Sequence, residues 1–221
     1  NYTTFDACKE VFKQNGIVII FSEGRCINEW HLRPLKKGTA RLATSSWEEG
    51  IPLTVLPVGL NYNTFRNFGK NVFVNFGHPL DREKVLQHQT DGRMFLTFNE
   101  QLKAELQTLV YEIEPCDRKK LEEKVSVPLP YWIRVALFVP AVAGFFLHAP
   151  LYFPAKALNR KYFDNDHFDS SLVGMLMLAY PVYLLLWYVL AAFIFNWIFA
   201  LIVFPLLTLS AWACVQLKPQ V

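Results

Sequence analysis

The chain has 221 residues, of which 52% are hydrophobic and 19% are charged, and its formal net charge is +3. This small positive charge gives no indication of a nucleic-acid-binding protein, because clustering of charge matters more than the total. The composition changes along the chain: charged residues are frequent before about Pro130, become rare after it, and are absent from Leu172 to Leu217.

Before about Pro130 the sequence alternates helical and strand-like patterns. An amphipathic helix is predicted over residues 2–14, and the following Asn-Gly is typical of a helix end. The run Ile17–Phe21 is apolar at every position, as in a strand that is buried on both faces of a parallel sheet. The same patterns predict a helix over 38–47, strands over 53–60 and 71–76, and a long amphipathic helix over 95–113. This alternation predicts an α/β domain with a mixed or parallel sheet.

The four cysteines are scattered and form no C-x-x-C pair, so the spacing predicts neither a metal site nor a disulfide framework. We expect free thiols in a reducing cytosol. The cysteines are Cys8, Cys26, Cys116 and Cys214.

The loop after the first predicted strand is rich in basic residues. Ligands of open α/β sheets bind beyond the carboxyl ends of the strands, and the free N–H groups at the start of the next helix favour an anion. The pattern therefore predicts a phosphate site, with a solvated basic loop as the alternative that the charges alone leave open. Against Glu23 and Glu29, the basic residues are Arg25, Arg33, Lys36, Lys37 and Arg41.

Four segments of this region resemble the glycerolipid acyltransferase family, whose best-known members are the 1-acyl-glycerol-3-phosphate acyltransferases. Ile19–Arg25 is similar to the Phe-Pro-Glu-Gly motif, with Ser22 in place of the proline, and Leu35–Gly38 to the hydrophobic-Lys-x-Gly segment after it. Ile51–Val58 resembles the next, proline-bearing strand, and Val72–Gly77 the strand that ends in Phe-Gly. The resemblance covers residues 1 to about 80, in the family's order.

The resemblance implies acyl transfer from acyl-CoA or acyl carrier protein to a glycerol-phosphate or lysophospholipid hydroxyl in phospholipid synthesis, without a further cofactor. Glu23 and Gly24 would shape the glycerol-phosphate pocket, and Pro57 would end the strand that lines the acyl or acceptor site. Arg25 and Lys36 would neutralise the phosphate, although Arg25 stands where many members have Thr or Gly followed by Arg. The expected substrate-binding residues are Glu23, Gly24, Arg25, Arg33, Lys36 and Pro57.

The family's catalytic His-x-x-x-x-Asp does not occur in this sequence, because none of its five histidines has Asp five positions later. The nearest match, His78 with Glu83, lies on the wrong side of the Glu-Gly segment. The chain also starts at Asn1 inside the family pattern, so we expect an N-terminal truncation and a chain that is inactive alone. The alternative is a non-catalytic, membrane-embedded module that binds lipid or a protein partner. His31 is either a phosphate ligand or a solvent-exposed loop residue, and His78 is expected to be structural.

The C-terminal region is predicted to reside in a membrane. Leu172–Leu217 contains 46 uncharged residues, or about 70 Å of helix, which is twice what one crossing of a ~30 Å hydrocarbon core needs. We therefore expect a hairpin of helices over 172–195 and 197–217 that turns at Asn196-Trp197. The earlier apolar segment, 135–155, contains three prolines and is expected to be spanning or re-entrant, or else a buried helix of the α/β domain.

Basic residues flank each apolar segment, which places every flank in the cytoplasm and makes the first segment re-entrant. The predicted organisation is an acyltransferase-like α/β portion over 1–116, a basic linker over 117–131 and a membrane region over 132–217, of which 132–155 is re-entrant or spanning. A small transporter is disfavoured, because the long apolar run contains no charge that could serve an ion path. The expected partners are membrane lipid and the acyl donor, and the oligomeric state is not predicted.

Overall fold

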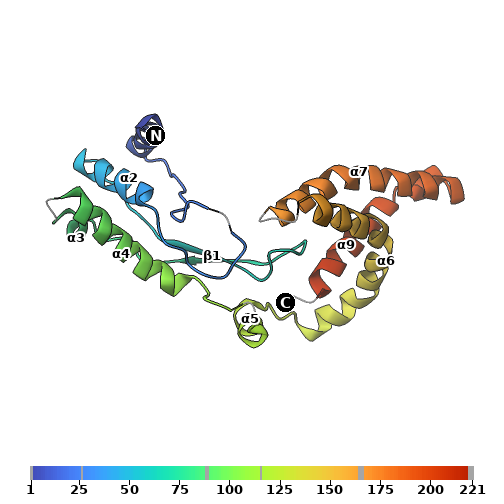
Figure 1. Ribbon diagram of the computed structural model, residues 1–221. Helices are drawn as coiled ribbons and strands as arrows, with labels where there is room; N and C mark the ends of the chain where they lie inside the picture. Colours follow the sequence, from blue (N-terminus) through green and yellow to red (C-terminus); the bar gives the residue numbers. More distant parts are fainter. Residues whose placement is uncertain (1, 26, 88–89, 115, 164–166, 219–221) are drawn as a thin grey trace. The chain divides into compact units, whose positions relative to one another are not determined.

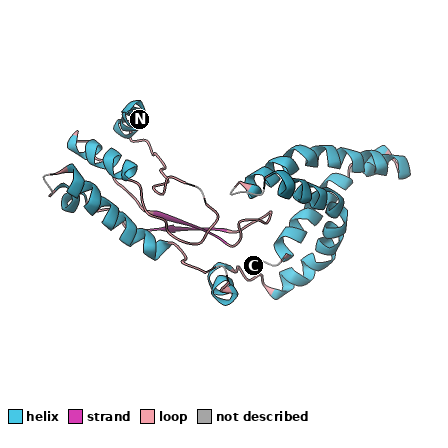
Figure 2. Cartoon of the chain, in the orientation of Figure 1, coloured by secondary structure: helices cyan, strands magenta, loops and turns pink. Residues whose placement is uncertain are grey.

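The computed structural model describes residues 2–25, 27–87, 90–114, 116–163 and 167–218. The chain divides into two compact units. Unit 1 consists of residues 1–62 and 72–120, and unit 2 of residues 63–71 and 121–221. Described secondary structure is mostly helical, with one small two-stranded sheet (Figure 2).

The helices of unit 1 agree with the sequence patterns. The helix predicted over 2–14 is confirmed, and after it Asn15 has a positive φ of 56°, which is typical of a helix end. The helices predicted over 38–47 and 95–113 are also confirmed, although the second begins earlier and ends before Ile113. The helices are α1 (Tyr2–Lys13), α2 (Lys37–Glu48), α3 (Arg82–Leu86) and α4 (Asp91–Leu109).

The described sheet of unit 1 has two antiparallel strands, which corrects the expectation of a mixed or parallel sheet. It pairs β1 (Val58–Tyr62) with β2 (Val72–Phe76), and Leu60 lies opposite Val74. The two strands are joined only by residues 63–71, and a parallel pair needs a longer crossover of a dozen residues or more. The strand predicted over 71–76 is present as β2, whereas only the last three residues of the strand predicted over 53–60 belong to β1, which continues to Tyr62. The short connection fixes the antiparallel arrangement of the two strands.

The prediction of a buried strand over Ile17–Phe21 is wrong. The segment is not part of the described sheet, and Ile17, Ile19 and Phe21 are 89%, 81% and 70% exposed. β-Branched residues favour a strand only where neighbouring strands and side chains can pack against them. Within the described part of unit 1, this segment has no such neighbour on the sheet.

The core of unit 1 lies between α2 and α4. Trp47 is buried against Phe98 with the ring centroids 6.0 Å apart, and its indole N–H donates to the Leu53 carbonyl at 2.8 Å. The carboxyl end of α4 is joined to the sheet, because the side-chain amides of Asn61 and Asn75 donate to the Leu109 carbonyl at 2.9 and 2.8 Å. The packing of α2 on α4, and of α4 on the sheet, therefore supports the loop that precedes α2.

Unit 2 contains three helical stretches that are long and apolar enough to cross a membrane: 131–162, 168–194 and 197–217. The predicted division of the uncharged run at Asn196-Trp197 is confirmed, since two residues separate the end of α7 (Phe168–Ile194) from the start of α8 (Trp197–Ala200). At the turn, the Asn196 side chain accepts the N–H groups of Ile198 and Phe199 at 2.9 and 3.0 Å, which caps α8. The remaining helices are α5 (Arg118–Val125), α6 (Tyr131–Tyr162) and α9 (Val203–Leu217).

The proline-containing segment 135–155 forms the central part of α6. Its prolines lie inside the helix, where each removes an N–H donor and favours a bend. Figure 1 shows α6 changing direction along its length, so that its first part runs beside α9 and its second part beside α7. The Tyr183 hydroxyl donates to the Leu147 carbonyl, and the Asn159 amide donates to the Phe168 carbonyl at 2.7 Å. Since α6 packs in unit 2, the alternative of a helix buried in the α/β domain does not hold.

Candidate functional site

The loop between α1 and α2 is bonded directly to the first turn of α2. The Ser22 carbonyl accepts the Lys36 N–H at 2.8 Å, and the Ser22 and Thr39 hydroxyls lie 2.9 Å apart. Gly24 lies at the turn with a positive φ of 69°, and a side chain there would meet Lys36 Cγ at 3.2 Å. This conformation suits glycine, and it brings the Glu-Gly segment against the start of a helix.

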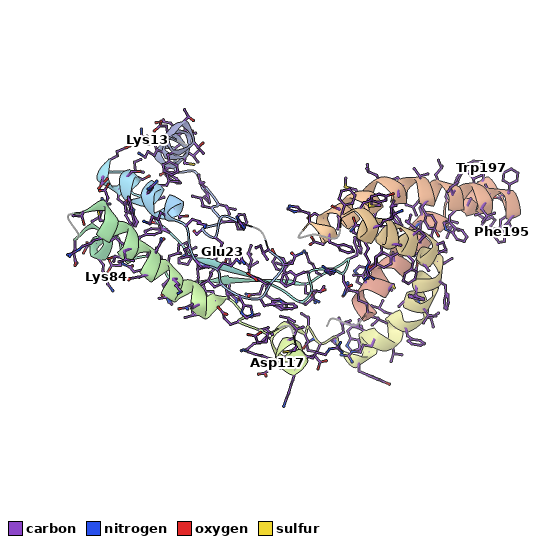
Figure 3. All side chains as sticks on the ribbon, viewed as in Figure 1. Lys13, Glu23, Lys84, Asp117, Phe195 and Trp197 are labelled. Carbon is purple, nitrogen blue, oxygen red and sulfur yellow. The ribbon has the colours of Figure 1, made fainter. Side chains whose placement is uncertain are left out.

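Glu23 forms a hydrogen bond within the same loop. Its carboxylate accepts the backbone N–H of Arg33 at 3.1 Å. Arg33 itself is ion-paired, because its Nε donates to the Glu29 carboxylate at 2.5 Å. Glu23 therefore has a positioning role in the loop, and the charge of Arg33 is largely compensated within it. Figure 3 shows Glu23 on this loop.

Arg25, Lys36 and Lys37 have exposed side chains. Lys36 and Lys37 lie at the start of α2, and Arg25 follows Gly24, which lies close to Lys36. Lys36 is the N-cap residue and gives no side-chain cap to the helix. The first N–H groups of a helix have no acceptor within it and attract anions, and the nearby cations add to that potential. The geometry can therefore hold a phosphate against α2 with these side chains around it.

Pro57 belongs to the sheet side of unit 1. It is buried immediately before β1, and its carbonyl accepts the Gly77 N–H at 3.0 Å. It thus extends the pairing of β1 and β2 by one position. Its expected role at an acyl or acceptor site stays a prediction.

Comparison with known proteins adds a separate line of evidence. Residues 2–61 match the family model described as Acyltransferase. We refer to residues 2–61, which are similar to this family, as the acyltransferase segment. The match agrees with the resemblance to glycerolipid acyltransferases and supports a general acyltransferase function. No curated protein and no solved structure matches the chain.

Within the acyltransferase segment, the sequence left two roles open for His31, and the structure gives it carboxylate partners. Its Nδ1 lies 3.0 Å from Glu112 and its Nε2 lies 3.9 Å from Glu114. The hydrogen bond to Glu112 raises the pKa of His31 and lowers the pKa of Glu112. Glu112 also accepts the Leu32 N–H at 3.3 Å. His31 therefore joins the loop between α1 and α2 to the chain beyond α4.

Glu112 is a residue that sequence reasoning missed. It lies 81 positions from His31, and no short motif links the two. The contact between Glu112 and His31 exists only in the folded chain, where the residues that follow α4 lie beside the acyltransferase segment. His78, in contrast, is highly exposed and lies 3.5 Å from Glu105 of α4.

The described residues contain no group of three His, Cys, Asp or Glu side chains that is arranged to hold a metal ion. Cys8, Cys116 and Cys214 are free thiols, as the spacing predicted, and Cys26 lies outside the described residues.

Proposed function

We propose that the chain takes part in transferring an acyl group from an acyl thioester to the hydroxyl of a glycerol phosphate or lysophospholipid in phospholipid synthesis. The observation that carries this proposal is the acyltransferase match over residues 2–61. Those residues include the loop in which Gly24 lies against Lys36 at the start of α2.

In this proposal the acceptor phosphate lies at the start of α2. Arg25 and Lys36 neutralise it, because both are exposed beside free helix N–H groups. Glu23, by accepting the Arg33 N–H, keeps the loop in the shape that admits the phosphate. In this proposal Arg33 helps to shape the loop through its ion pair with Glu29. Pro57, which is buried just before β1, supports the sheet side of the site.

The reaction requires a base. The acceptor hydroxyl gives its proton to the base and attacks the thioester carbonyl, and the carbon–sulfur bond then breaks to release the donor thiol, CoA or acyl carrier protein. No histidine of this sequence has Asp five positions on. We therefore propose that this chain supplies acceptor binding and that the base lies outside it.

The second candidate function is a non-catalytic, membrane-embedded lipid-binding module, and the missing His-x-x-x-x-Asp favours it. The upstream reading frame separates the two candidates. A version of the protein that extends in frame through that motif should transfer acyl groups from acyl-CoA to lysophosphatidate. If the gene begins at this position, the enzyme proposal fails and the binding module remains.

Acceptor binding can be tested by photolabelling in neutral phosphatidylcholine nanodiscs with a photoreactive lysophosphatidate. We expect Arg25→Ala and Lys36→Ala each to reduce labelling of residues 17–41 roughly tenfold, because each removes one hydrogen bond to a charged group. Lys84→Ala is the matched control, since this exposed lysine lies on α3, apart from Glu23 in unit 1 (Figure 3). Equal labelling in all three variants would refute the phosphate role. The role would also be refuted if Arg25→Ala and Lys36→Ala reduced labelling by a photoreactive monoacylglycerol, which lacks the phosphate, as much as they reduced labelling by the lysophosphatidate.

We further propose that the acyltransferase segment faces the cytoplasm, with α6 re-entrant and α7 and α9 crossing the bilayer. The basic flanks of the apolar segments support this orientation, and the bend of α6 supports re-entry (Figure 1). α7 has 27 residues, or about 40 Å of helix, so its two ends fall on opposite sides of a ~30 Å hydrocarbon core.

Accessibility labelling tests this topology in a chain whose four native cysteines are replaced. Ser170→Cys, at the start of α7, should react with an impermeant maleimide from the cytoplasmic side only. Phe195→Cys, at the other end of α7 (Figure 3), should react from the opposite side only. Labelling of the Ser170 variant solely from the non-cytoplasmic side would overturn the topology.

A further inference from the structure

The Glu112 carboxylate uses both of its oxygens to hold the loop between α1 and α2. One oxygen lies 3.0 Å from His31 Nδ1, and the other accepts the Leu32 N–H at 3.3 Å. The backbone makes a further contact beside it, because the Ile113 N–H donates to the Trp30 carbonyl at 3.2 Å. Ile113 is completely buried. Two adjacent residues beyond α4 therefore hold three consecutive residues of the loop.

This contact continues along the loop to Glu23. The residue after Leu32 is Arg33, whose backbone N–H donates to the Glu23 carboxylate at 3.1 Å. Glu23 directly precedes Gly24, the glycine of the turn that lies against the start of α2. Hydrogen bonds to successive backbone N–H groups thus join Glu112 to that turn, although Glu112 itself lies 81 positions from His31 in the sequence.

The surroundings of the His31 ring are mostly negative. Its Nε2 lies 3.9 Å from Glu114, on the side opposite the Glu112 contact. A phosphate that bound His31 would have to approach these carboxylates, whereas a protonated ring is favoured by them. The charged groups around the pair are Glu29 and Arg33 of the loop, Glu112 and Glu114 beyond α4, and Lys120 of α5, whose ammonium donates to the Glu112 backbone carbonyl at 2.6 Å.

We propose that Glu112 is a positioning residue for the acceptor phosphate, and that its pairing with protonated His31 makes the order of the loop between α1 and α2 depend on pH. The acceptor part of this statement rests on the proposed function. The ordering of the loop does not, since it depends only on contacts within unit 1.

The sign of the pH dependence follows from the two groups. The bond to Glu112 raises the pKa of His31, so its contribution is complete below the ordinary value of about 6.5 and is lost as the pH rises through the raised value. The bond to His31 lowers the pKa of Glu112, so its contribution is complete above the ordinary value of about 4.3 and is lost as the pH falls through the lowered value. The loop should be most ordered between these two ordinary values and should loosen towards pH ~8.5.

Hydrogen exchange of the whole chain in detergent, followed by mass spectrometry, tests the pairing without a lipid ligand. The readout is the protection of amides within residues 27–36, corrected for the intrinsic exchange rate at each pH. In the wild-type chain we expect about two- to fivefold lower protection at pH ~8.5 than at pH ~6, the range for an exposed ion pair. Glu112→Gln keeps an acceptor for the Leu32 N–H but removes the charge, so protection should be low at both pH values.

Glu105→Gln is the matched control, because Glu105 of α4 lies 3.5 Å from another histidine, His78, and this change should leave the pH dependence of the loop as in the wild-type chain. His31→Gln, which keeps a donor for Glu112 but cannot titrate, should also remove the pH dependence and decides the matter if Glu112→Gln folds poorly. Equal wild-type protection at the two pH values would overturn the proposal, as would a wild-type pH dependence in His31→Gln.

Photolabelling with the photoreactive lysophosphatidate in phosphatidylcholine nanodiscs extends the test to the acceptor. Glu112→Gln should reduce labelling of residues 17–41 about two- to fivefold at pH ~6 and by less at pH ~8.5, where the wild-type loop is also loosened. Comparing chains at one pH cancels the titration of the phosphate itself. Equal labelling at pH ~6, while Arg25→Ala still reduces it, would overturn the positioning role. Labelling that does not respond to Arg25→Ala would instead overturn the proposed function, and the exchange result would still decide the pairing.

Discussion

Replacing Phe98 with alanine is expected to lower the free energy of unfolding of unit 1 by about 3–5 kcal/mol. Phe98 is completely buried in α4, where its ring packs against Trp47 of α2. Truncation removes apolar contact area and leaves a cavity between two helices that cannot fully close. Since the loop between α1 and α2 is bonded to the first turn of α2, the loss should also loosen that loop.

Hydrogen exchange of the whole chain in detergent, followed by mass spectrometry, measures this effect locally. Peptides from α2 and α4 should exchange orders of magnitude faster in Phe98→Ala, and peptides from α7 should not change. Leu96→Ala is the control on the same helix, because Leu96 is 59% exposed and its truncation should cost little. Unchanged protection of α2 in Phe98→Ala would contradict the assignment of this core.

Replacing Gly144 with alanine is expected to destabilise unit 2 by about 1–3 kcal/mol, the usual cost of overpacking. The α6 and α9 backbones approach at this glycine, and the added Cβ would lie 2.6 Å from the Ser210 carbonyl carbon and closer still to its oxygen. A backbone carbonyl cannot move aside as a flexible side chain can. Small residues permit this kind of contact between membrane helices.

Gly174→Ala, in α7, provides the matched control because nothing lies within 4 Å of its added Cβ. It should be neutral or stabilising, since alanine favours a helix over glycine by about 1 kcal/mol. The measurement is the thermal unfolding midpoint of each variant in the same detergent, with exchange of α6 and α9 peptides as the local readout. If Gly144→Ala were as stable as Gly174→Ala, the close packing of α6 on α9 would be refuted.

The exposed apolar segment Ile17–Phe21 is expected to promote association of the protein with other chains. Its large apolar side chains and its backbone are not covered by the described sheet. An exposed apolar strand-like segment readily pairs with other chains. This segment directly precedes the Ser22–Gly24 turn, so a chain that pairs with it would also disturb the loop between α1 and α2.

Several features were determined by the sequence alone because they depend on local patterns. The 46 uncharged residues of Leu172–Leu217 are too long for one membrane helix and too apolar for a loop, and Asn196 marks the break because its side chain caps the next helix. Helical spacing likewise located α2 and α4. The Glu-Gly segment and the basic residues before α2 located the candidate site, since their chemistry is apparent from residue type.

Other features were decided only by tertiary structure, because they depend on contacts between distant residues. The apolar run at Ile17 looked like a buried strand, but burial requires neighbours that the pattern cannot supply. The direction of β2 followed from the length of the 63–71 connection. The pairing of His31 with Glu112, which is 81 positions away, showed which carboxylate near the loop is already paired.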